Sequence, residues 1–162
     1  MDFSRVRIKG IEYINDNEFD SYEFNHPNQR TMDRFGKKAL YLAQKLFKEA
    51  EYNTFSPEKS GVVLSTHTGP LDSVKEHADI LLSKGYKGIN PSRFPNTMLS
   101  TALSLVVTAL QFRGPSTAMY LDDSTEHALR YAVIQLEKGM CELMMLLIVN
   151  ENADDFGVCF SV

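Results

Sequence analysis

The stretch LMMLLIV at residues 143–149 places seven apolar side chains in succession, with no polar residue among them. This pattern is typical of a strand buried on both faces, as in a parallel sheet that helices cover on each side. A second apolar run, GVVLST at residues 61–66, is bounded by turn residues and fits another buried strand. The two runs predict the centre of a sheet.

Weaker strand signals lie toward the two ends of the chain. Residues 6–14 alternate apolar and polar side chains around Gly10, which indicates a half-buried strand with a bulge or bend at the glycine. Residues 117–121 fit a short strand, and the final run, 156–162, fits an edge strand. The polar residues 15–31 are expected to form a loop that folds over the domain.

Helical periodicity fills most of the sequence between these strands. Residues 32–51 carry an apolar stripe at three- and four-residue spacings, and Thr31 is placed to cap that helix. Residues 97–112 are apolar on most sides, which predicts a buried helix. A further helix is expected over 124–138, closed by Gly139.

The segment from Pro70 to Gly85 is also helical in pattern, with proline suited to its first turn and glycine to its end. One face of this helix is lined by Val74, Ala78, Leu81 and Leu82. His77, next to that face, is expected to be partly exposed. Strands alternating with helices predict an α/β layered fold, organised as a single domain over residues 1–162.

Composition excludes several classes of function. A net charge of −4, without a dense Lys/Arg cluster, gives no footprint for nucleic acid. The longest apolar run is too short to span a bilayer, and the polar N-terminus lacks the apolar core of a signal peptide. Two cysteines are too few for a disulfide framework, and the histidines show no metal-binding spacing. We expect a cytoplasmic protein without metal or cofactor.

Five short motifs, in order along the chain, resemble the N-terminal half of a β-ketoacyl synthase. They are Met32-Asp33-Arg34-Phe35 before an Ala-containing helix, Gly61-Val62-Val63, the Asn-Pro…Phe-Pro-Asn loop at 90–96, Arg113-Gly114-Pro115-Ser116, and Lys138-Gly139-Met140-Cys141-Glu142. Each motif alone is weak, and their order and distances carry the resemblance over roughly residues 30–150. It implies a thiolase-like layered half-domain, with a mostly parallel sheet covered by helices.

The same resemblance implies a nucleophilic cysteine that this sequence lacks. Counting back from Gly139, Asp122 stands at the nucleophile's place, with Asp123 and Ser124 beside it. A carboxylate would form a hydrolysable anhydride with an acyl group, not a thioester, so we expect no catalytic residue here. Asp122 or Asp123 is instead expected to cap the following helix. The two histidines of the family's C-terminal half have no counterpart in this sequence.

The sequence gives weaker support for the other candidate site residues. Ser124 and His127 are spaced for an acyl-transfer pair, although a surface or packing role suits His127 better. His67 follows the strand at 61–66, where α/β sheets often bind ligands, and a turn role is its alternative. Phe94 and Asn96 join it as candidate binding residues, and Cys141 is expected to act as a small core hydrophobe.

Three functions remain open from the sequence. The favoured one is a non-catalytic ketosynthase-like accessory or partner protein in fatty-acid or polyketide-type biosynthesis. The resemblance implies dimerisation through the strand at Thr117, Met119 and Leu121, either with itself or with a ketosynthase; an acyl carrier protein is a further candidate partner. The alternatives are an acyl-transfer enzyme completed by a partner chain, and a binding module with an acyl pocket under the helix at 102–107.

Overall fold

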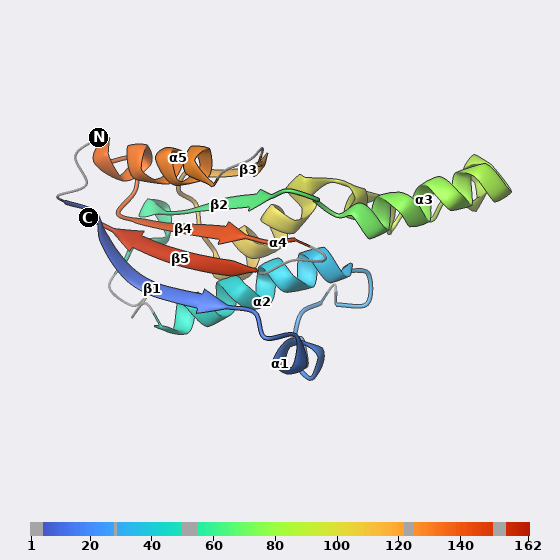
Figure 1. Cartoon of the computed structure of the whole chain (residues 1–162), viewed down its shortest axis with the longest axis horizontal. Helices are drawn as coiled ribbons and strands as arrows, with labels where there is room; N and C mark the ends of the chain where they lie inside the picture. The colour runs from blue at the N-terminus through green and yellow to red at the C-terminus, as the bar shows by residue number, and fades with distance from the viewer. Residues whose placement is uncertain (1–4, 28, 50–54, 122–124, 151–154) are drawn as a thin grey trace.

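The computed structural model of the chain describes residues 5–27, 29–49, 55–121, 125–150 and 155–162, which form a layered α/β domain (Figure 1). Its sheet has the strand order β1-β5-β4-β2-β3. The strands are β1 (Arg7–Tyr13), β2 (Ser60–Thr66), β3 (Ser116–Tyr120), β4 (Leu143–Ile148) and β5 (Phe156–Ser161). The helices are α1 (Asp16–Asp20), α2 (Arg34–Glu49), α3 (Leu71–Lys84), α4 (Leu99–Leu110) and α5 (Glu126–Glu137).

The apolar runs that decide the fold lie side by side. β2 is parallel to β4 on one side and to β3 on the other, and both β2 and β4 are buried along their whole length. β5 is antiparallel to β4 and to β1. The prediction of an edge strand at 156–162 is therefore wrong, because β1 pairs with the outer side of β5. The irregularity expected at Gly10 is present as a register shift between Ile8 and Gly10.

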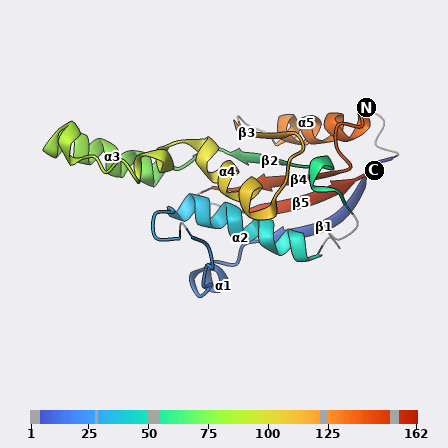
Figure 2. The same ribbon diagram turned by 180° about the vertical axis from the view of Figure 1, so that it is seen from behind.

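Helices cover the two faces of the sheet unequally. α2 and α4 lie together on one face, and α5 lies alone on the other (Figures 1 and 2). Each face has its own apolar core, which we call the α2-side cluster and the α5-side cluster. The α2-side cluster includes Leu42, Val62 and Met145, and the α5-side cluster includes Val63, Ala132 and Met144. None of the helices in the described ranges is long and apolar enough to cross a membrane.

Two expectations about the helices need correction. Asp33, not Thr31, caps α2, because its carboxylate accepts a hydrogen bond from the backbone N–H of Gly36 at 2.8 Å. The helix at 97–112 is not buried on most sides. Only Ala102 and Val106 of α4 are fully buried, since the opposite side of the helix carries hydroxyl side chains and faces away from the sheet.

α3 extends away from the rest of the domain as an arm (Figure 1). Two short 3-10 helices, η4 (Tyr86–Gly88) and η5 (Phe94–Thr97), pack along one side of it. Gly85 ends the helix with φ 66°, as the sequence indicates. His77 is buried at the base of the arm, so the expectation of partial exposure is wrong. The ring lies near Phe94, and Nδ1 is 2.8 Å from the carbonyl of Ser73.

Glycine allows β2 and the segment before β3 to approach each other closely. A Cβ built on Gly61 would collide with the backbone carbonyl oxygen of Pro115, and a Cβ on Gly114 would lie 2.6 Å from the carbonyl oxygen of Ser60. Backbone atoms cannot move aside as a flexible side chain can. The two glycines therefore set the spacing between β2 and β3.

We predict that Gly61→Ala lowers the free energy of unfolding by about 3 kcal/mol, because the sheet must open locally to admit the methyl group. Gly139→Ala is the control. It has a positive φ of 67° but open space around it, so it should cost only about 1 kcal/mol. Urea unfolding of both variants measures the difference, and equal losses would contradict the close-approach explanation.

Candidate functional site at the carboxyl edge of the sheet

The carboxyl ends of the three parallel strands meet at one edge of the sheet, where α/β folds commonly place functional groups. β3 is followed by Leu121, whose backbone N–H donates to the carbonyl of Thr66 at 2.7 Å. Asp122, Asp123 and Ser124, which occupy the nucleophile's place, lie outside the described residues. The N-cap position of α5 is Thr125, and the predicted capping by Asp122 or Asp123 likewise falls outside the described residues.

A buried polar cluster occupies this edge, and we call it the carboxyl-edge network: Lys38, Thr66, Asn150 and Asp155. Lys38 comes from α2, Thr66 ends β2, Asn150 follows β4 and Asp155 precedes β5. Each of the four side chains lies in an otherwise apolar part of the domain and is fully or almost fully buried. The network therefore joins four segments that are distant in sequence.

An ion pair forms the centre of the network. The Nζ atom of Lys38 lies 2.7 Å from Oδ2 of Asp155, and it donates a second hydrogen bond to the carbonyl of Asn150 at 3.2 Å. The side chains are 3% and 1% exposed. The backbone N–H of Asn150 donates to the other carboxylate oxygen. Charges buried this deeply persist only when their remaining hydrogen-bonding capacity is met.

Asn150 carries the network across to the end of β2. Its side-chain oxygen accepts hydrogen bonds from the Thr66 hydroxyl at 3.2 Å and from the backbone N–H of His67 at 2.8 Å. The Thr66 hydroxyl oxygen in turn accepts from the backbone N–H groups of Thr68 and Gly69. The turn after β2 is therefore held by side chains, and these bonds orient the start of the arm.

The predicted binding residues do not come together as one site. The His67 backbone joins the network, but the residue is exposed to solvent. Phe94 and Asn96 lie on η5 at the base of the arm, where Asn96 lines a polar cavity of about 110 Å³ together with His77 and Asp33. Burial raises the pKa of Asp33 above its usual value. His67 does not line this cavity.

The predicted interface strand lies at the edge of the sheet. β3 pairs with β2 on one side and with no described strand on the other. Thr117 and Met119 are half-buried on it, and Met119 packs against the α5-side cluster. Leu121 lies beyond the strand and is buried in that cluster. Association through this edge stays a prediction.

Both cysteines are structural in position. Cys141 lies in the α5-side cluster and Cys159 in the α2-side cluster, each fully buried. Burial raises the pKa of the Cys141 thiol to about 11, so the thiol stays protonated at neutral pH. The expectation that Cys141 is a core hydrophobe fits this geometry. Neither cysteine can stand in for the family's nucleophile, because a thiol must be ionised and accessible to react.

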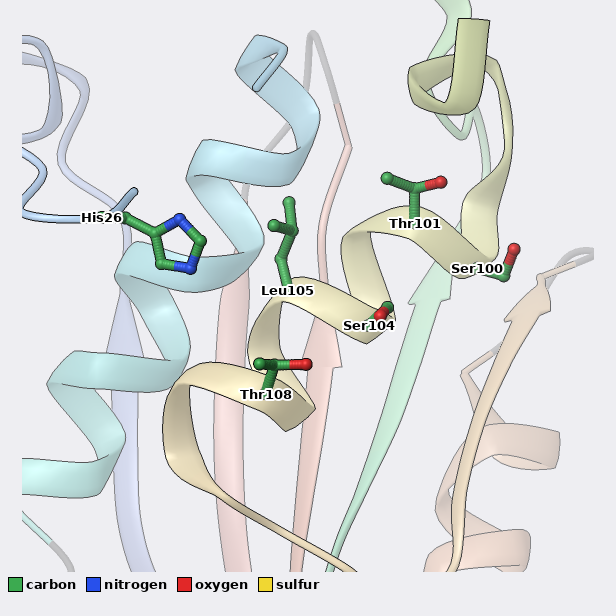
Figure 3. Close-up of a pocket in the computed structure, with 6 residues that line it drawn as sticks. All are labelled: His26, Ser100, Thr101, Ser104, Leu105 and Thr108. Atoms are coloured by element: carbon green, nitrogen blue, oxygen red, sulfur yellow. The ribbon is translucent and has the colours of Figure 1, made fainter. Parts of the chain in front are cut away.

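The two remaining expectations about sites concern the Ser124–His127 pair and an acyl pocket under α4. His127 is exposed near the start of α5, and Ser124, its proposed partner, is not among the described residues. The space under α4 is filled by Ala102 and Val106, which pack into the α2-side cluster, so the geometry does not support an acyl pocket there. A groove of about 430 Å³ lies instead along the outer side of α4, lined by His26, Leu105 and hydroxyl side chains (Figure 3).

Sequence reasoning missed the carboxyl-edge network. The first local signal is a lysine, Lys38, between the buried apolar residues of α2. Asn150, directly after the apolar run at 143–149, is the second signal. Ser65 was missed as well. Its hydroxyl is fully buried next to β3 and β4 and has no hydrogen-bond partner among the residues that the structure describes.

The order of the sheet, its helices and this carboxyl edge define a ketosynthase-type layered half-domain. The chain belongs to the β-ketoacyl synthase family: the model of the family's N-terminal domain matches residues 4–155. No curated protein matches the chain significantly in sequence.

Solved structures share the fold at low sequence identity. A type II polyketide acyl-carrier protein in complex with its ketosynthase bound to the hexaketide (AntDE:AntF) matches with a TM-score of 0.82 and 12% identity over 97% of this chain and 62% of that chain. The ishigamide ketosynthase/chain length factor matches with a TM-score of 0.73 and 17% identity, over 86% of this chain and 47% of that one. This chain thus spans less than two thirds of either matched chain.

A third match covers a larger share of the matched chain. The ketosynthase ApeO in complex with its chain length factor ApeC, from Xenorhabdus doucetiae, gives a TM-score of 0.72 and 10% identity. The match covers 97% of this chain and 79% of that chain.

Removing one partner of the Lys38–Asp155 ion pair should lower the stability of the fold far more than replacing both partners. We predict that Lys38→Met lowers the free energy of unfolding by about 3–5 kcal/mol, because the Asp155 carboxylate stays buried without its partner. The double variant Lys38→Met/Asp155→Asn removes the uncompensated charge and should recover at least half of the loss. Chemical denaturation measures both. A double variant no more stable than the single one would contradict the charge-burial explanation.

Burial should also protect both cysteines. We predict that an aromatic disulfide reagent at pH 8 modifies neither thiol in the folded protein and both in urea. The raised pKa of Cys141 has a further consequence for stability. The unfolded chain loses this proton above pH 9 and the folded chain only near pH 11, so stability should fall as the pH rises through that window. Rapid modification of either thiol in the folded protein at pH 8 would contradict the burial of the two cysteines.

Proposed function

We propose that this chain is a non-catalytic subunit that pairs with a ketosynthase in fatty-acid or polyketide-type biosynthesis. The observation that carries the proposal is an N-terminal ketosynthase-type half-domain whose sequence has no cysteine at the nucleophile's place. The sequence has no cysteine between Gly114 and Gly139, and its two cysteines are fully buried elsewhere. A chain that kept the fold but lost the thiol cannot hold an acyl group as a thioester.

The edge strand β3 supports a pairing role. Unpaired strand edges invite pairing with another chain, and proteins usually protect them. No described strand pairs with the outer edge of β3, and Thr117 and Met119 lie half-buried on this strand. A strand of the partner that adds to this edge would extend the sheet across the two subunits.

A ketosynthase is the partner that the comparisons favour. The matched structures include a ketosynthase with its chain length factor and a ketosynthase with an acyl-carrier protein. One of those complexes contains a chain that this one covers to 79%, which supports the idea that a short chain of this fold serves as a subunit. We therefore favour a heterodimer of this chain with a ketosynthase over a homodimer. In that heterodimer the acyl-carrier protein binds to the ketosynthase subunit.

We predict that Met119→Asp abolishes association with the ketosynthase, because its charge, beside the outer edge of β3, would be buried on pairing. Circular dichroism must first show that the variant folds, since Met119 also packs against the α5-side cluster. Affinity should fall by on the order of a hundredfold or more. Co-expression with the ketosynthases of the source organism, followed by light scattering of the purified complex, measures this. Met140→Asp is the matched control, since Met140 is exposed and lies outside β3. Stable pairing of the Met119→Asp variant would contradict the proposed edge.

The non-catalytic part of the proposal has its own test. The purified chain, incubated with an acyl-carrier thioester, should gain no acyl group by intact-mass spectrometry. An adduct that disappears in Ser124→Ala would instead support the acyl-transfer alternative and overturn the non-catalytic assignment.

A further inference from the structure

A small polar cavity of about 110 Å³ lies at the base of the arm. Three segments of the chain enclose it, namely the residues before α2, the first turns of α3 and the stretch around η5. Its charged and polar lining includes Arg30, Asp33, Ser73, Glu76, His77 and Arg93. Since a water molecule takes about 30 Å³ in the liquid, this volume suits a ligand of about four to six non-hydrogen atoms.

The ring of His77 is 9% exposed and has one nitrogen without a hydrogen-bond partner among the described residues. Its other nitrogen, Nδ1, lies 2.8 Å from the carbonyl oxygen of Ser73. A carbonyl oxygen only accepts, so Nδ1 carries the proton and Nε2 of the neutral ring is an acceptor. Buried polar atoms are nearly always hydrogen-bonded. Because His77 lines the cavity, the group that satisfies Nε2 there must be a donor.

Two carboxylates add further acceptors to the same cavity. Oδ1 of Asp33 accepts from the backbone N–H of Gly36 and Oδ2 accepts from the Ser73 hydroxyl, each at 2.8 Å. Each oxygen can therefore accept one more hydrogen bond. Burial raises the pKa of Asp33, which indicates that its charge is poorly solvated. Glu76 contacts Arg93 at 3.7 Å, too long for a hydrogen bond.

A primary ammonium group matches these three acceptors. It carries three N–H donors, one for Nε2 of His77 and one for each carboxylate. A metal ion fits less well, because the described ranges contain no group of three or more His, Cys, Asp or Glu side chains that could hold one. The cation expected here is therefore held by hydrogen bonds.

Arginines on the same cavity indicate that the ligand also carries an anionic group. The Arg30 guanidinium makes no ion pair or hydrogen bond with a described residue, and the Arg93 side chain makes only the long contact with Glu76. A guanidinium binds a carboxylate through paired N–H···O bonds, whereas it repels an ammonium ion. Two positive and two negative side chains therefore suit a ligand that carries both charges.

We propose that the cavity at the base of the arm binds a small amino acid, of the size of glycine or β-alanine. The ammonium group of the ligand donates to His77 and to the two carboxylates, and its carboxylate accepts from Arg30. Bound there, the ligand joins the start of α2 to α3 and to the segment around η5. The site shares no residue with β3, so it goes beyond the pairing with a ketosynthase, and either can fail without the other.

Nuclear magnetic resonance of the histidine rings tests this site directly. The full chain is produced with ¹⁵N-labelled histidine, and His77→Phe identifies the signals of His77 among the four histidines. Glycine should shift the Nε2 signal of His77 with a Kd on the order of 1 mM, since so small a ligand makes few contacts. The signals of His67 and His127, which do not line the cavity, should not move.

Substitutions of arginines separate the site from general effects of charge. Arg30→Gln should weaken glycine binding about tenfold, because the ligand loses its charge-assisted hydrogen bonds. Arg113→Gln is the matched control, since Arg113 is exposed and does not line the cavity. Met119→Asp should also leave glycine binding unchanged, because the β3 edge takes no part in this site.

Two fragments of the ligand decide between the alternatives. Acetate carries the carboxylate alone and methylammonium the ammonium alone, and each should bind on the order of tenfold or more weaker than glycine. Acetate that binds as tightly as glycine would mean a simple anion site at the arginines, and equally tight methylammonium a simple cation site at the carboxylates. An Nε2 signal unmoved on the order of tens of millimolar glycine would mean that water alone fills the cavity. Each of these three results would overturn the proposal.

Discussion

The buried ion pair between Lys38 and Asp155 is the constraint on which the arrangement of the domain depends. It fixes α2 to the connection between β4 and β5, and through Asn150 it also fixes the turn after β2. Taking two charges out of water costs several kcal/mol for each ion, and their attraction repays this only in good geometry. The backbone groups of Asn150 supply the remaining hydrogen bonds. The pair therefore tolerates one arrangement of these segments and penalises others.

Helices cover the two faces of the sheet unequally. α2 is held against β5 and β1, and α4 packs beside it over β2 and β3, so one face of the sheet is closed along its whole width. α5 closes only the part of the other face over β2 and β4. Apolar side chains on β1 and β5 are left outside the domain's own core.

The sequence predicts where helices and strands lie along the chain better than it predicts which of them lie side by side. The apolar run at 143–149, the irregularity at Gly10 and the helix end at Gly85 all follow from local rules, and all three are confirmed. Strand order is not local, which is why 156–162 was placed at an edge although β1 covers it. α4 illustrates the same limit, because hydrophobic composition does not reveal that one side of this helix faces away from the sheet.

The carboxyl-edge network could not have been predicted for a similar reason. Lys38 and Asp155 are 117 residues apart in sequence, and neither spacing nor composition indicates that they meet. The surroundings of His77 also depend on a distant segment, since the aromatic ring near it belongs to η5. Polar residues inside a fold are specified by the partners that satisfy them, and those partners become visible only when the chain is assembled.

The chemistry of the network bears on whether this edge of the sheet acts on a substrate. A catalytic site keeps polar groups aimed at the position of the reacting atoms, so these groups lack full satisfaction until the substrate binds. Here the Lys38 ammonium, both Asp155 oxygens, the Asn150 side-chain oxygen and the Thr66 hydroxyl all bond to groups of the chain itself. Their hydrogen bonds are used in holding strands, helix and turn together. The polar groups of the carboxyl-edge network are therefore committed to holding the fold together.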